Sequence, residues 1–187
     1  PYCFGAEFYR ETYNAGGIPT QTAQFPPILK FAVGNDHGAG AFGQAIADEV
    51  YAGGPRAYYN DFWKARSPGT YAKQLADLGI PVLIWGTHLD IYTESALSMY
   101  TYLQNAHSGK YVYGPMDTNQ KPTGRYQAII SQGGHCQFEE QSTGQNIANS
   151  ITLQWFDTWL KGQKTGMADT SRPLHVHELL SNNWVSM

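Results

Sequence analysis

The sequence predicts an α/β fold in which parallel strands form a sheet flanked by helices. Two short apolar runs without charged residues, 81–86 and 126–131, are typical of parallel strands buried on both faces. Helical patterns alternate with these runs along the chain, which is the order that a parallel sheet requires. Each run leads through a short turn to a titratable side chain, Asp90 after the first and His135 after the second.

The composition fits one globular domain with a substantial core, since the chain has 187 residues of which 42% are hydrophobic. No run approaches the roughly 18 apolar residues that a membrane helix needs, so we expect no membrane partner. The net charge is −3 and there is no basic run, so we expect no nucleic-acid partner. Pro1 opens the chain in place of Met, which we interpret as a processed, trimmed or partial chain.

The low charge content favours a location outside the cytoplasm. Charged residues make up 14% of the chain, against about 25% in an average globular domain. Secreted proteins often have such a composition, so we expect an extracellular or periplasmic protein. The two cysteines, Cys3 and Cys136, permit one disulfide without requiring it.

One strand and one helix are predicted in the first third of the chain. Residues 28–33 form a short apolar run that predicts a buried strand. Residues 41–51 carry Phe42, Ile46 and Val50 four positions apart, which predicts a helix.

Three helices are predicted in the rest of the chain. Residues 71–78 end at Gly79, a typical residue for a helix C-terminus. Residues 94–105 follow Thr93, which we expect to be the N-cap. The third helix ends at Gly162 and carries an apolar stripe made of Ile147, Ile151, Trp155 and Trp159.

Four stretches of the chain carry a resemblance to a known family. They are residues 26–30 (PPILK), 61–68 (DFWKARSP), 80–90 (IPVLIWGTHLD) and 155–162 (WFDTWLKG). Together they resemble the cocaine esterase / X-Pro dipeptidyl-peptidase family of α/β-hydrolases, which also contains α-amino acid ester hydrolases and glutaryl acylases. Residues 173–178 (PLHVHE) resemble the first strand of the family's C-terminal jelly-roll domain.

The resemblance implies the C-terminal part of an α/β-hydrolase core, with a cap insertion and the start of a C-terminal β domain. Residues 1–33 then flank the nucleophile and residues 34–60 form the cap. Residues 61–170 form the hydrolase core that carries the acid and the histidine, and residues 171–187 begin the jelly-roll-like domain.

By the same resemblance, Asp90 is the acid and His135 the general base of a catalytic triad. The order of Asp before His along the chain is that of α/β-hydrolases. The implied activity is that of a serine esterase or acylase, which cleaves a small-molecule ester or amide through an acyl-enzyme. No cofactor and no metal are implied. Gly133 and Gly134 precede His135, where the family often has a Gly-Pro-Trp type of approach.

The nucleophile is not identified in this chain. The family's serine stands on a sharp turn before the helix that leads to residues 26–30, but no serine precedes Ser67. Two ways of counting bring Thr12 or Ala15 near its expected place. Three interpretations are open: an engineered change from Ser at Ala15, a serine on another segment or chain, or a catalytically inactive hydrolase-fold binding protein.

Simpler interpretations exist for the two site residues. Asp90 is also placed to interact with the dipole of the helix predicted over 94–105, and a His after two glycines is typical of a surface loop. A metal site made of His88, Asp90 and His135 is a further alternative, although the spacing His-x-Asp is weak for this purpose.

The last predicted strand, 173–180, carries His175 and His177 on one face. We expect this face to be solvated. Cys136 follows His135 directly, and neighbouring side chains on a loop normally diverge, so we expect a buried or disulfide-bonded thiol rather than a nucleophile.

Overall fold

The computed structural model describes residues 45–46, 48–50, 52–90, 92–134, 147–181 and 183–187. The chain divides into two compact units, Pro1–Ser67 and Pro68–Met187. The predicted strand over 28–33 lies outside the described residues. So do several residues singled out above: Cys3, Thr12, Ala15, His135 and Cys136.

The described part of the first unit is helical. Residues 45, 46 and 48–50 are helical, which confirms the helix predicted over 41–51 for the residues described. The short helices η1 (Pro55–Ala57) and α5 (Asp61–Lys64) follow. Their apolar residues form one buried cluster: Ile46, Val50, Ala57 and Trp63.

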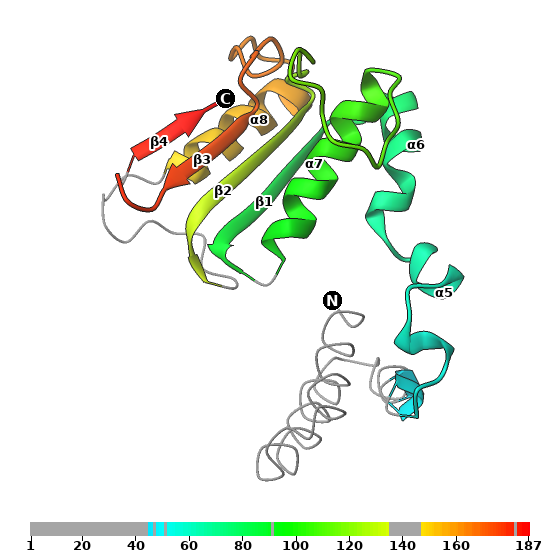
Figure 1. Ribbon diagram of the computed structural model, residues 1–187. Coiled ribbons are helices and arrows are strands. Elements are labelled where there is room, and N and C mark those ends of the chain that lie inside the picture. Colours follow the sequence, from blue (N-terminus) through cyan, green and yellow to red (C-terminus); the bar gives the residue numbers. More distant parts are fainter. Residues whose placement is uncertain (1–44, 47, 51, 91, 135–146, 182) are drawn as a thin grey trace. The chain divides into compact units, whose positions relative to one another are not determined.

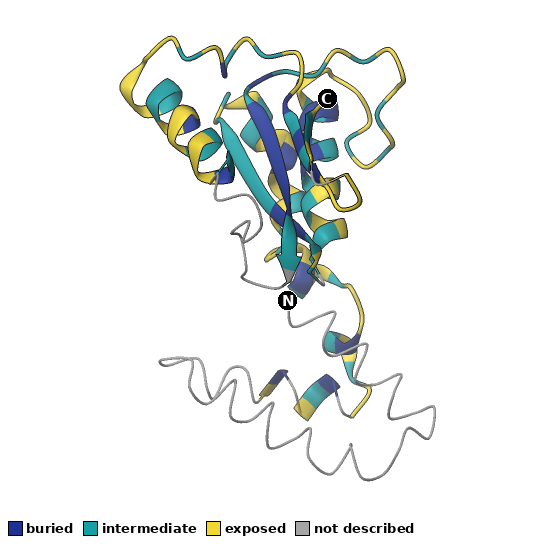
Figure 2. Ribbon diagram, turned by 90° about the vertical axis from the view of Figure 1, so that its left-hand side faces the viewer, coloured by how far each residue is buried: buried dark blue, intermediate teal, exposed yellow. Residues whose placement is uncertain are grey.

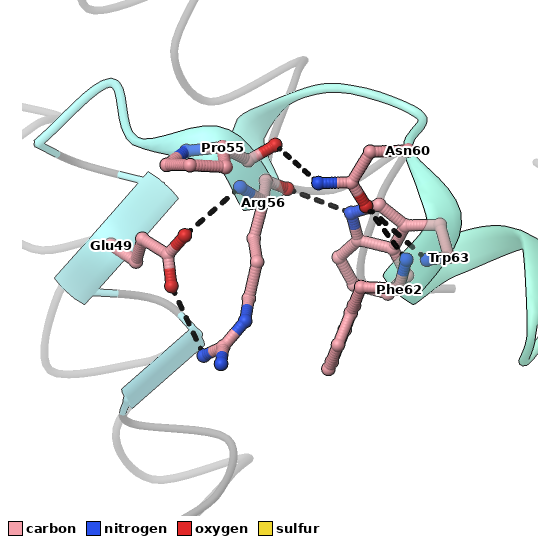
Figure 3. Close-up of polar contacts among 6 residues, drawn as sticks. All are labelled: Glu49, Pro55, Arg56, Asn60, Phe62 and Trp63. Carbon is pink, nitrogen blue, oxygen red and sulfur yellow. Dashed lines mark hydrogen bonds and ion pairs between the residues drawn. The ribbon is translucent and has the colours of Figure 1, made fainter.

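Polar contacts join the helical residues 48–50 to η1 and fix the turn between η1 and α5 (Figure 3). Glu49 and Arg56 form an ion pair with 3.1 Å between Oε2 and Nη1. The Trp63 indole N–H donates to the Arg56 carbonyl at 2.8 Å. The Asn60 side-chain oxygen accepts from the backbone N–H groups of Phe62 and Trp63. Asn60 therefore caps a helix that is only four residues long.

The second unit is built on a four-stranded sheet with the strand order β1-β2-β3-β4 (Figure 1). The strands β1 (Val82–Leu89), β2 (Tyr126–Gly134) and β3 (Leu174–Glu178) are parallel. The strand β4 (Asn183–Ser186) runs antiparallel to β3. The two charge-free runs of the sequence thus form neighbouring parallel strands, and the predicted α/β class is confirmed for the described part of the chain.

Helices cover both faces of this sheet (Figures 1 and 2). The helices η2 (Pro68–Tyr71), α6 (Ala72–Asp77) and α7 (Thr93–His107) lie on one face, and α8 (Ile147–Lys161) lies on the other. Figure 2 shows β2 in dark blue along most of its length, since it is covered from both sides. The core on the α7 face contains Ala72, Leu103, Tyr126, Val82 and Ile84.

The predicted ends of α6 and α8 are confirmed. Gly79 has φ +64° and Gly162 has φ +67°, the left-handed conformation that glycine adopts without strain. The prediction that Thr93 is the N-cap of α7 is wrong, because the helix begins at Thr93 itself. Its hydroxyl donates to the carbonyls of Thr87 and Asp90 instead of accepting from a helix N–H.

The predicted solvation of His175 and His177 is also wrong, although the two side chains do alternate along one strand. Their exposed fractions are 7% and 0%. The reason is that β3 lies between β2 and β4, and side chains of these two strands pack against the imidazoles. From β4, Ser186 hydrogen-bonds to His175, and Trp184 packs edge-to-face on the His177 ring at 5.4 Å.

The strands β3 and β4 belong to the same sheet as β1 and β2. That residues 171–187 also begin a separate, jelly-roll-like β domain stays a prediction. The cap insertion over 34–60 likewise stays a prediction.

Candidate active site

The carboxyl ends of β1 and β2 meet at one edge of the sheet, because the two strands are parallel neighbours. Their register pairs Leu89 with Gly134. Asp90 directly follows Leu89, and His135 is the next residue of the sequence after Gly134. His135 itself lies outside the described residues. In the sequence, each of the two predicted site residues therefore directly follows one residue of the Leu89–Gly134 pair.

Asp90 lies in a turn whose hydrogen bonds fix its backbone and one carboxylate oxygen. Its N–H donates to the Thr87 carbonyl at 3.2 Å, and the Thr93 hydroxyl donates to the Asp90 carbonyl at 2.7 Å. The Tyr92 N–H donates to Asp90 Oδ1 at 2.9 Å. Since Tyr92 precedes α7, the carboxylate interacts with the positive end of the helix dipole, as the simpler interpretation expected.

The strand β2 changes from apolar to polar close to this edge. Ala128, Ile129 and Ile130 are buried, and Ser131, which follows them, is fully buried as well. Ser131 Oγ has no hydrogen-bond partner among the described residues. Thr87, which pairs with Ser131 across the ladder, is also fully buried. Burying polar side chains costs free energy, so their position sets this edge apart from ordinary core.

His88 lies two positions before Asp90, but its ring is bound within the sheet. Its Nε2 lies 2.7 Å from the carbonyl oxygen of His177 on β3. A carbonyl only accepts hydrogen bonds, so Nε2 carries a proton and only Nδ1 could bind a metal. Among the described residues, no group of three or more His, Cys, Asp or Glu side chains is arranged to hold a metal ion. The metal-site alternative, which includes His135, stays untested.

A second polar cluster joins β2, β3 and β4 farther from this edge. The Gln127 side-chain amide donates to the carbonyls of Gly124 and Met167 at 2.7 and 2.8 Å. Its oxygen therefore accepts from His175 Nε2 at 3.0 Å, which leaves His175 Nδ1 to accept from the Ser186 hydroxyl at 2.9 Å. Burial lowers the pKa of His175 below its usual 6.5. His175 is thus a neutral, structural residue at neutral pH.

The sequence analysis missed these buried polar residues because it treated 126–131 as a uniformly apolar run. Gln127 and Ser131 stand four positions apart in this run, on the same face of the strand. Uncharged polar residues at such positions, in a strand expected to be buried on both faces, are the pattern that could have identified them.

No protein-family model, curated protein or solved structure matches this chain. Membership of the cocaine esterase / X-Pro dipeptidyl-peptidase family therefore stays a prediction from the sequence, and so does the extracellular or periplasmic location. Within the described ranges, no helix combines the length and the apolar character needed to cross a bilayer.

Proposed function

We propose that this chain supplies the acid and the general base of a serine hydrolase, Asp90 and His135, for the cleavage of an ester or amide. The observation that carries the proposal is the register of β1 and β2, in which Leu89 pairs with Gly134. In the sequence, Asp90 directly follows Leu89 and His135 directly follows Gly134. Ligands of open α/β sheets bind at this edge.

In the proposed reaction, the imidazole of His135 removes the proton of a serine hydroxyl as its oxygen attacks the substrate carbonyl. The same imidazolium then donates this proton to the leaving alcohol or amine, and a water molecule later releases the acyl group. Asp90 would hold the ring of His135 in the correct tautomer and stabilise its positive charge. The bond from the Tyr92 N–H to Asp90 Oδ1 supports this role, because it orients the carboxylate before substrate binds.

The serine comes from a part of the protein that the described residues do not include. Thr12 and Ala15 lie near its expected place by sequence, and a serine on another segment or chain is the interpretation that we favour. The backbone N–H groups that stabilise the oxyanion would come partly from the same turn. We expect a small or aromatic acyl group, with no metal or cofactor.

The experiment is active-site labelling of the full-length protein with a fluorophosphonate, together with hydrolysis of a 4-nitrophenyl ester. We expect labelling at one serine, and His135→Ala should lower the rate at least about 1,000-fold. Asp90→Asn should lower it to a similar degree with only a small loss of thermal stability, because the amide keeps the oxygen that accepts from the Tyr92 N–H and loses only the charge at the α7 N-terminus.

His107 offers a matched control, since it is exposed and lies at the opposite end of α7 from Asp90. His107→Gln should leave both labelling and turnover unchanged. Turnover that survives His135→Ala would contradict the proposal.

One observation favours an alternative, which is a catalytically inactive binding protein on the same fold. No serine precedes Ser67 in this sequence, where the nucleophile is expected. This alternative predicts no fluorophosphonate labelling of the full-length protein, and it predicts a coding sequence without a nucleophile turn.

A further inference from the structure

Arg125, which directly precedes β2, carries a positive charge that no acidic side chain balances among the described residues. The two helices beside it each contain one acid, and both acids are already paired. Asp77 of α6 forms an ion pair with Lys73 at 2.7 Å, and Asp157 of α8 forms one with Lys161 at 2.6 Å. Arg125 is also partly buried, so water solvates its charge incompletely. A partly buried cation without a counter-ion indicates a place where an anion would be stabilised.

The guanidinium of Arg125 is held in a fixed position and still has hydrogen-bond donors to spare. Its Nη1 donates to the Gly79 carbonyl, and the group lies over the ring of Trp159, 4.9 Å from the ring centre. A guanidinium has five N–H donors, and the hydrogen bond to Gly79 uses one of them. A planar fork that two contacts already hold loses little freedom when it binds a carboxylate.

Trp159 supplies a further donor next to this guanidinium. Its indole Nε1 is buried and has no hydrogen-bond partner within the described part of the chain. A buried N–H without an acceptor costs free energy, so an acceptor that reached it would be stabilised. Because the guanidinium lies over the same ring, one anion at the edge of the indole could accept from both groups.

Exposed apolar side chains flank these donors. Leu78 and Ile80 stand on either side of Gly79 in the sequence, and Leu160 follows Trp159. Their exposed fractions are 74%, 43% and 75%. A single exposed leucine is ordinary, but here three apolar side chains adjoin the two residues that contact one guanidinium. This surroundings of a cation fits a ligand that has both an anionic group and an apolar group.

We propose that Arg125 and Trp159 bind a small carboxylate that carries an apolar chain, as a medium-chain fatty acid does. The carboxylate accepts from the unused N–H groups of Arg125 and from the indole N–H. The guanidinium shifts slightly toward the anion and thereby opens the edge of the ring. The apolar chain covers Leu78, Ile80 and Leu160. This site lies at the amino-terminal ends of β1 and β2, opposite the candidate active site, and does not depend on the proposed function.

The test is isothermal titration of the full-length protein with octanoate, acetate and 1-octanol. Octanoate should bind at least about 10-fold more tightly than either of the others, because only octanoate combines the charge with the apolar chain. Octanol that binds as tightly as octanoate would show that Arg125 does not recognise an anion. Acetate that binds as tightly would show that the apolar side chains take no part. Either result, or no binding of octanoate, overturns the proposal.

Two variants connect the binding to these residues. Arg125→Met should weaken octanoate binding at least about 10-fold, since it removes the charge. Trp159→Phe keeps an aromatic ring beneath the guanidinium and removes the N–H, so it should weaken binding about 5-fold. Arg66→Met is the matched control and should leave binding unchanged. Arg66 has the same two kinds of contact, since its guanidinium lies 3.8 Å from the centre of the Phe62 ring and donates to the Phe62 carbonyl at 2.8 Å.

NMR of the wild-type protein keeps the test independent of how well Arg125→Met folds. The indole N–H signal of Trp159 is the one that disappears in Trp159→Phe, and it should shift when octanoate is added. Binding of octanoate that leaves this signal in place would place the ligand elsewhere and overturn the proposal.

Discussion

At the scale of single residues, the second unit uses hydrogen bonds to bury polar side chains in its sheet. His175 is the clearest case, because Gln127 fixes which of its nitrogens carries the proton. The Ser186 hydroxyl completes the arrangement by donating to the other nitrogen. If His175 were protonated, Nδ1 would also carry a proton, so the Ser186 hydroxyl would have to turn and accept a hydrogen bond instead of donating one. The positive charge would also lie in a buried site.

This arrangement predicts a pH dependence of stability. Burial lowers the pKa of His175 below 6.5, so the unfolded chain binds its proton more readily than the folded one. The stability that neutral His175 provides is therefore fully present above pH 6.5. It is lost as the pH falls from 6.5 through the lower pKa of His175 in the folded state. Urea unfolding at a series of pH values should show this loss in the wild type and less of it in His175→Gln.

The exposed His107 again provides the comparison. His107→Gln removes an exposed imidazole and leaves the hydrogen bonds of His175 to Gln127 and Ser186 in place. An identical slope in His175→Gln and wild type would show that another group is responsible.

At the scale of elements, one residue joins the amino-terminal side of the sheet to helices on both faces. Arg125 directly precedes β2, and its guanidinium donates to the Gly79 carbonyl after α6. The same guanidinium lies 4.9 Å from the centre of the Trp159 ring on α8. Arg125 thus links three elements that are far apart in the sequence.

We expect Arg125→Met to lower the free energy of unfolding by about 1–2 kcal/mol, through loss of a cation–π contact and a hydrogen bond to a backbone carbonyl. Arg172→Met is the matched control, because Arg172 is exposed and its recorded hydrogen bond comes from its backbone N–H alone. Chemical denaturation of the two variants would measure the difference. Equal losses in both would mean that Arg125 does not act as a link.

The elements that the sequence predicted well are those with a strong local pattern. β1 and β2 were predictable because their runs lack charge, and α8 was predictable because its apolar stripe ends at a glycine. The role of Thr93 was not, because it depends on two carbonyls that only the folded turn brings together. The burial of His175 and His177 depends on β4, a strand of four residues that carries little pattern of its own.

At the scale of the whole molecule, some features of the candidate site follow from local sequence pattern, and others depend on contacts that only the folded sheet brings together. The sequence pattern alone predicts the order of Asp90 before His135 and the parallel pairing of the strands that precede them. It also predicts the edge of the sheet at which a site is expected. The His88 contact could not be predicted, since it joins residues 89 positions apart across a bulge. Long-range side-chain contacts of this kind are set by the register of three strands together, and no local pattern encodes that register.

The most direct measurement is a crystal structure of the full-length protein, in which the distance from the Asp90 carboxylate to the nearer ring nitrogen of His135 can be determined. The proposed pairing predicts a hydrogen bond of about 2.6–3.2 Å at the carboxyl edge of β1 and β2. A separation well beyond about 4 Å, with the His135 ring directed away from this edge, would contradict it.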